Sequence, residues 1–215
     1  CVGRITTAVR SGRVRTAGLG GDSRVRIEQN GSIRIGPDRV VPLARLAAED
    51  PRVERELLSM GRKPVRQRKV TDLEYWMLRE PRLAERSAGT TGLRDRLIDL
   101  LSRGPRSVTA LLRDLGVHHP VQLGEEELIR GRVIERAALT PTDVLHATGA
   151  VGLWSTAAGR VACECASLLH EMELEKLAED VLDVIVSRMV EEAVIFLANA
   201  SGTERLEAGI ADEPW

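Results

Sequence analysis

The sequence predicts a mixed α/β (α+β) protein in which an antiparallel β meander is followed by helices. In the first 36 residues, short runs alternate apolar and polar side chains between Gly- and Asn-containing turns, and beyond residue 50 apolar residues recur every three or four positions. With 215 residues and 43% hydrophobic content, the chain can bury a real core as one large domain or two small ones.

Charge and aromatic content exclude some functions. The 31 basic and 32 acidic residues nearly cancel, which argues against a globally basic nucleic-acid binder. Aromatic residues make up only 2% of the chain, so base-stacking surfaces are not expected and aliphatic side chains must fill the interior.

The meander contains a strong hairpin signal at Asn30-Gly31. The flanking residues 23–28 and 32–35 alternate, and two further β-like runs precede them at 2–9 and 12–16. The alternation places the arginines on one face and the apolar residues on the other, namely Val25, Ile27, Ile33 and Ile35.

A glycine-rich turn lies inside the meander at residues 16–23, TAGLGGDS. Glycine lets backbone N–H groups approach and converge on an anion, which makes this turn a candidate ligand site. A hairpin connection or bulge that needs glycine explains the same residues, so both interpretations stay open.

A helix is expected from Pro51 to about Met60, with Asp50 as its N-cap. It completes a first unit, residues 1–60. Residues 61–70, GRKPVRQRKV, carry five basic and no acidic side chains. We expect a solvated linker over 61–89, with a phosphate- or nucleic-acid-binding patch as the alternative.

Residues 90–139 read as helix, turn, helix, turn, helix and are similar to a winged-helix module. Ser107 is expected to cap the second helix and Gly116 to end it. The stretch that would read DNA begins with three glutamates, at 125–127, which would repel phosphates. A scaffold or lid is therefore favoured over a DNA reader.

The last unit, residues 140–215, is predicted to be helical. Thr140-Pro141-Thr142-Asp143 is a helix start, which either caps a core helix or brings Asp143 and His146 to a substrate cleft. Residues 155–200 predict an almost continuous helix that needs a partner surface, which the meander, another helix or a second copy of the chain would supply. Its expected apolar face comprises Leu174, Leu177, Val181, Val184, Ile185 and Val194.

The three cysteines, Cys1, Cys163 and Cys165, form no disulfide framework, and a cytoplasmic setting is expected. Cys163, Cys165 and His170 are not predicted to bind a metal. The two cysteines are two positions apart on a helix, so their side chains diverge, and a zinc site would need a second ligand pair of compatible spacing. Neither a signal peptide nor an apolar run of about 18 residues is evident, so no membrane association is expected.

Two segments carry a resemblance to a known family. The run TAGLGGDSRVRIEQNGSIRIGPDRVVPL, residues 16–43, resembles the glycine-rich turn, hairpin and Gly-Pro pair of the hydantoinase/oxoprolinase family large subunit (hydantoinase A-like). The run ALTPTDVLHATGAVGLWSTAAGRVACECAS, residues 138–167, is similar to the family's LTPTD helix and the Ala-rich helix after it.

This resemblance implies an actin-like ATPase (ribonuclease H-like) domain with the winged-helix-like segment as an insertion. It implies ATP-dependent opening of cyclic amides such as hydantoins or 5-oxoproline, or ketone carboxylation as in some relatives. The two D-G-G-T phosphate turns expected upstream are missing, and Arg39-Val40-Val41-Pro42 replaces a Ser-Ala-Gly run. The chain is therefore expected to be an inactive C-terminal-half fragment of a longer enzyme.

The matched positions imply site residues. Gly18, Gly20 and Gly21 match the cofactor-binding turn, and Asp22 and Ser23 are the candidate catalytic residues. Thr142, Asp143 and His146 are the candidate substrate residues. ATP and Mg²⁺ are the implied cofactors of the full-length enzyme, and none is expected in the fragment.

The implied partners are a small cyclic amide and a second hydantoinase-type subunit, with self-association through the C-terminal helices as a further expectation. The alternative function is a winged-helix nucleic-acid-binding or regulatory module. In it, residues 61–70 would contact phosphates and residues 118–130 would read the bases.

Overall fold

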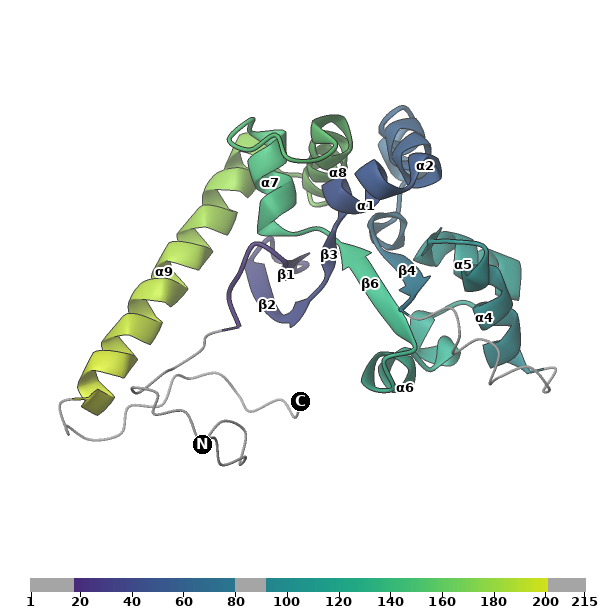
Figure 1. Ribbon diagram of the computed structural model, residues 1–215. Helices are drawn as coiled ribbons and strands as arrows, with labels where there is room; N and C mark the ends of the chain where they lie inside the picture. The colour runs from purple at the N-terminus through teal and green to yellow at the C-terminus, as the bar shows by residue number, and fades with distance from the viewer. Residues whose placement is uncertain (1–17, 80–91, 201–215) are drawn as a thin grey trace.

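A computed structural model of the chain describes residues 18–79 and 92–200, with side chains to residue 198. It is mixed α/β, with two small sheets among predominantly helical elements (Figure 1). Helices α1, α2, α7 and α8 lie along the top of the view, the sheets lie beneath them, and α9 extends down one side.

The predicted hairpin is confirmed. Strands β1 (Ser23–Ile27) and β2 (Ile33–Arg39) pair antiparallel, with Val25 opposite Ile35 and Ile27 opposite Ile33. The first pair is buried and the second half-buried, as the alternation predicts. The register shifts between Ser23 and Val25, because β2 bulges around Gly36-Pro37. The strands expected at 2–9 and 12–16 lie outside the described residues.

The second sheet has the strand order β3-β6-β4-β5. Strands β3 (Val41–Pro42) and β6 (Ile134–Ala138) are parallel, whereas β4 (Tyr75–Leu78) is antiparallel to both β6 and β5 (Arg106–Ser107). Part of the expected linker is thus a strand at the interior of a sheet. The strand buries Tyr75 and Trp76, to 1% and 0% exposure, and this burial holds it in place.

A layer of helices packs against the hairpin to form the larger core. It contains α1 (Leu43–Glu49), α2 (Pro51–Gly61), α7 (Pro141–Ala147) and α8 (Thr156–Leu169). Helix α2 begins as predicted, since the Asp50 side chain accepts a hydrogen bond from the Arg52 amide at 2.9 Å.

A smaller core surrounds Trp76 of β4. Helices α4 (Leu93–Ser102), α5 (Val108–Leu115) and α6 (Glu125–Arg130) pack on it, and short 3-10 turns lie at Val65–Gln67, Val70–Leu73 and Pro120–Leu123. Helix α5 ends at Gly116 as predicted. Ser107 occupies the N-cap position, but its hydroxyl donates to Glu56 Oε1 at 2.9 Å and does not cap the helix.

The C-terminal region divides into two helices, because the chain turns after α8 and α9 (Leu174–Ala200) begins in a new direction. Leu177 and Val181 are completely buried, as expected. Val194 is 53% exposed, because it lies about 100° around α9 from the face that carries Leu177 and that continues to Ile195, which is 5% exposed. Within the described ranges, no helix is long and apolar enough to cross a membrane.

Replacing Leu177 with Ala is expected to lower the free energy of unfolding by about 2–5 kcal/mol, because it leaves a cavity where α9 meets the core. Leu153→Ala is the matched control. Leu153 is 74% exposed, and its change is expected to stay within about 0.5 kcal/mol. Urea unfolding measures both, and equal losses would contradict the assignment of Leu177 to the core.

Candidate functional site

The glycine turn is held together by the side chain of Ser23. Its hydroxyl accepts a hydrogen bond from the Gly20 amide at 2.9 Å and donates to the Gly18 carbonyl at 3.3 Å. The Ser23 amide donates to the Gly20 carbonyl at 3.0 Å. Since Ser23 is fully buried, its hydroxyl stabilises the turn and does not face solvent.

The turn packs directly on the start of α7. The Gly21 carbonyl accepts hydrogen bonds from the Thr142 amide at 3.1 Å and the Thr142 hydroxyl at 2.7 Å. A Cβ added to Gly21 would lie 2.6 Å from Thr142 Oγ1, so only glycine permits this approach. The two predicted site segments, far apart in sequence, are therefore in contact.

The Gly36-Pro37 pair lies against the same turn. A Cβ added to Gly36 would lie 2.7 Å from the Gly18 carbonyl oxygen, and Gly36 has a φ of +67°, which favours glycine. A Cβ added to Gly18 would in turn lie 3.7 Å from Pro37. The glycine turn, the Gly-Pro bulge and the start of α7 thus form one assembly, which we call the glycine-turn site: residues 18–23, 36–37 and 140–143.

The amides of Gly20 and Ser23 are used inside the turn, whereas those of Gly21 and Asp22 have no acceptor among the described residues. Gly21 is exposed, and the Asp22 carboxylate, 42% exposed, lies 3.4 Å from Arg39. The Gly21 and Asp22 amides and the Asp22 carboxylate are the groups of the glycine-turn site that we consider as candidate ligand contacts.

Asp143 lies beneath the site and is completely buried. Its carboxylate accepts hydrogen bonds from the amides of Leu43 (3.2 Å) and Ala44 (2.7 Å) in α1, and from the amide (2.9 Å) and hydroxyl (2.8 Å) of Thr140. Burial raises the pKa of Asp143 to about 6, although these hydrogen bonds favour the charged form. The geometry assigns Asp143 to joining the N-termini of α1 and α7, not to contacting a substrate.

His146 is also buried and fully bonded. The Trp154 amide donates to Nε2 at 3.1 Å, so Nδ1 carries the hydrogen and donates to the Thr142 carbonyl at 2.8 Å. The imidazole stacks on Trp154 with centroids 5.6 Å apart. His146 therefore fixes the loop after α7, and Thr142 is the member of this predicted trio that lies at the glycine-turn site.

A pocket of about 220 Å³ opens along β1, beside the glycine-turn site. Its floor is aliphatic, with Arg24, Glu74 and His170 among its polar residues. Arg24 donates to Glu74 at 2.6 Å, and the Trp76 indole donates to the other Glu74 oxygen at 3.1 Å. Burial lowers the pKa of Arg24, an effect that Glu74 opposes. The apolar residues that line it are Val25, Ile27, Val70, Leu73, Ala138, Leu139, Ala166 and Leu169.

The edge of β1 that faces away from β2 runs along the pocket. The Val25 amide donates to the Leu139 carbonyl at 2.8 Å, on the side of β1 away from β2, whereas the Glu28 amide donates to Ser32 across the hairpin at 2.9 Å. Because hydrogen-bonding direction alternates along a strand, the N–H and C=O of Ile27 point the same way as those of Val25, away from β2, and Ile27 lines the pocket. An amide-bearing ligand would find both a donor and an acceptor there.

This pocket could not be found from the sequence alone. Its walls come from β1, the turn at 70–74, the end of β6 and the end of α8, which are adjacent only in three dimensions. The alternation of β1 was the available signal for this pocket. It places Arg24 and Arg26, which line the pocket, on the face of the strand opposite the apolar residues.

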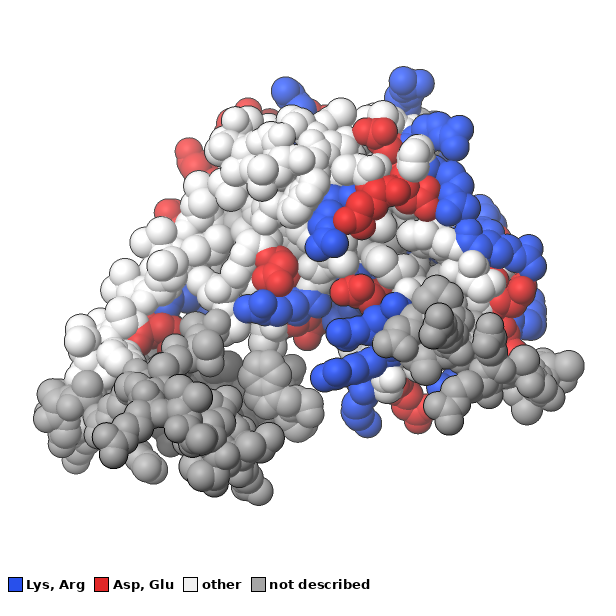
Figure 2. Space-filling view, in the orientation of Figure 1, with Lys and Arg blue, Asp and Glu red and all other residues white. Residues whose placement is uncertain are grey.

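An ion-pair network joins the two sheets. Arg136, whose side chain is 11% exposed, contacts Asp38 at 3.0 Å and Glu125 at 2.7 Å, and Asp38 also binds Arg26. Burial alone would raise the pKa of Asp38, but the two arginines outweigh it and hold the pKa below its usual range. Figure 2 shows basic and acidic side chains side by side across the middle of this face.

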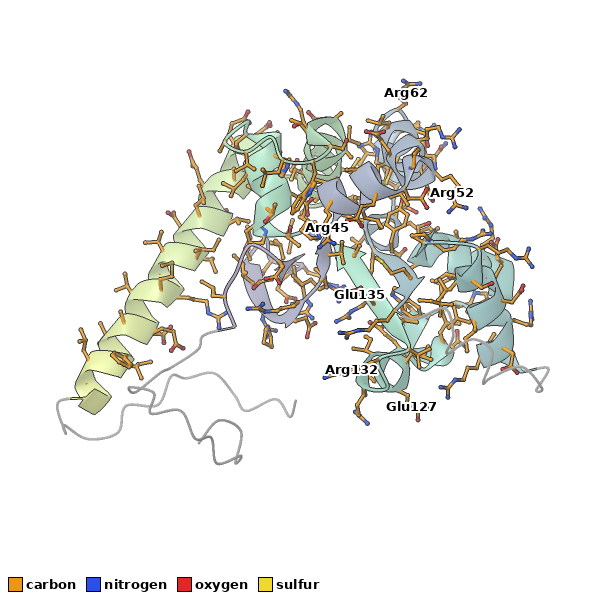
Figure 3. The ribbon with its side chains drawn as sticks, in the orientation of Figure 1. Arg45, Arg52, Arg62, Glu127, Arg132 and Glu135 are labelled. Carbon is orange, nitrogen blue, oxygen red and sulfur yellow. The ribbon has the colours of Figure 1, made fainter. Side chains whose placement is uncertain are left out.

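The features proposed for nucleic-acid binding do not form one surface. Arg62, in the basic stretch, lies at one end of the molecule, and Glu127 and Arg132, in and after α6, lie at the other (Figure 3). Glu125 is paired with Arg136 inside the protein, while Glu126 and Glu127 are exposed and make this end of α6 acidic.

No metal-binding cluster of three or more His, Cys, Asp or Glu is found in the part of the chain that the structure describes. Cys163 and Cys165 are both buried, and burial raises the pKa of each thiol. Cys165 Sγ accepts a hydrogen bond from Arg68 at 3.3 Å, which ties the basic stretch to α8.

The raised pKa of Asp143 predicts a pH-dependent contribution to stability. An acid with a folded-state pKa of about 6, against an unfolded value of 3.8, binds more protons when folded, so stability falls as pH rises between these values. The stability difference between wild type and Asp143→Asn should therefore shrink by up to about 3 kcal/mol from acid to neutral pH.

Urea unfolding of both proteins across this pH range measures the effect, and the Asn variant subtracts the titration of the other carboxyl groups. A difference that stays constant, or widens towards neutral pH, would contradict the raised pKa.

Comparison of the chain with protein-family models, with curated proteins and with solved structures finds no match. The features that bear on function are therefore the glycine-turn site, the pocket, and the two sequence segments that meet at the glycine-turn site.

Proposed function

We propose that this chain is part of an ATP-dependent hydrolase of cyclic amides, of the hydantoinase/oxoprolinase type and with an actin-like fold. One observation carries the proposal. The segments with the family resemblance, residues 16–43 and 138–167, pack together through Gly21 and Thr142, at the site where the resemblance expects a ligand.

The glycine-turn site suits a magnesium-bound phosphate group. The amides of Gly21 and Asp22 are donors for phosphate oxygens, and the exposed Asp22 carboxylate is the type of ligand that Mg²⁺ prefers. ATP would supply the phosphoryl group that activates an amide carbonyl towards water. Asp22 keeps the candidate role that the sequence analysis gave it, whereas Ser23 and Asp143 support the site from within.

The pocket suits the cyclic amide. A lactam or hydantoin ring presents an N–H and a C=O on one edge, which complements the N–H and C=O of Ile27. The aliphatic floor would cover the rest of the ring, in keeping with small-molecule sites that combine apolar walls with a few placed polar groups. The glycine turn leads directly into β1, and the pocket runs along this same short strand.

A pocket-filling variant tests the substrate assignment. Ala166→Leu places a larger side chain at the pocket wall, so hydantoin and 5-oxoproline should lose their effect on the Ile27 amide signal in NMR titrations. Ala157→Leu, at an exposed position of the same helix, should bind like wild type. Equal binding by both variants, or no response of the wild type, would refute the assignment.

A second variant tests the nucleotide assignment. In the full-length enzyme that contains this chain, binding of ATP should depend on Mg²⁺, and Asp22→Asn should lose most of that dependence because it removes the carboxylate. Asp99→Asn, an exposed position on α4, is the control. Isothermal titration with and without Mg²⁺ measures the effect. If Asp22→Asn and Asp99→Asn behave alike, the proposed role of Asp22 is wrong.

A further inference from the structure

We propose that the exposed face of α9 pairs, antiparallel, with α9 of a second copy of this chain. The first half of α9 belongs to the core through Leu177 and Val181, and Arg188 donates to the Ile35 carbonyl of β2 at 2.5 Å. The second half runs on beside and beyond the hairpin (Figure 1).

The exposed face has the spacing of a coiled-coil seam. Steps of four, three, four and three residues connect its members, which is the a/d pattern of a heptad repeat. The four large side chains are 45%, 58%, 61% and 37% exposed in chain order, and no position of the seam is charged. We call this set the α9 seam: Leu182, Val186, Met189, Ala193 and Phe196.

The α9 seam is complementary to itself. In an antiparallel pair, a and d positions of the two helices alternate in layers, which sets Met189 against Ala193 of the second copy and Val186 against Phe196. Each layer then combines a larger with a smaller side chain, which is how facing positions fill space without voids. A two-fold axis generates every such contact twice, so one patch serves both copies.

The area is sufficient for a modest interface. A 15-residue stretch of helix is about 22 Å long, and two such faces with their flanking side chains would bury on the order of 1,200 Å² in total. This value is at the lower limit for specific association, so we expect a reversible dimer of micromolar affinity.

Sedimentation velocity of the full 215-residue chain, over a range of concentrations, tests the proposal. Wild type should show a reversible monomer–dimer equilibrium. Met189→Glu should weaken it roughly 100-fold, because it places a carboxylate in the seam of both copies. Val121→Glu is the matched control, since Val121 is 72% exposed on a different surface, and it should leave the dimer intact.

Cross-linking tests the orientation. In a Cys1→Ser background, a mixture of Met189→Cys and Ala193→Cys proteins should form a disulfide-linked heterodimer faster than either protein forms a homodimer. A wild type that stays monomeric at all concentrations would overturn the proposal, and so would a dimer that Met189→Glu leaves unchanged. Faster homodimer formation by Met189→Cys would overturn the antiparallel arrangement.

Discussion

The structure depends on one buried carboxylate. Asp143 accepts four hydrogen bonds, two from the first amides of α1 and two from Thr140 at the start of α7, and it is completely removed from solvent. Helix N-termini leave amides without intrahelical partners, and a single acid satisfies those of two helices that are about 100 residues apart in sequence. The cost of burying the acid is reflected in its raised pKa, and the four donors offset much of that cost.

Asp143 and its four hydrogen bonds form a clamp between α1 and α7. This clamp positions the groups that we assign to function. With α7 held against α1, Thr142 presents its amide and hydroxyl to the Gly21 carbonyl, and the glycine turn is fixed at the head of β1. The turn leaves the Gly21 and Asp22 amides without an acceptor among the described residues, and β1 continues from it along the pocket wall. The positions of the proposed phosphate and amide sites therefore both depend on β1. A rigid support beneath this strand keeps the two sites in a fixed arrangement.

Local patterns predicted the local features. The Asn30-Gly31 hairpin, the Asp50 cap and the Thr140–Asp143 helix start each depend on residues within a few positions of one another, and all three are present. The position of β4 was missed because it depends on the burial of Trp76 by helices that come later in the chain. The second role of Asp143, at α1, and the pocket were missed for the same reason. Val194 was assigned to the apolar face of its helix, but the face that the fold buries continues through the neighbouring Ile195, which a pattern of apolar residues alone does not distinguish.

Native-state hydrogen exchange of the Leu43, Ala44 and Thr140 amides tests the clamp most directly. If the buried carboxylate joins α1 and α7, these three amides should exchange with one shared free energy, equal to that of core amides such as Ala162 and Leu177, and therefore only by global unfolding. Exchange of the α1 amides by a local opening that leaves Thr140 protected would show that the two helices are held independently, which contradicts the account.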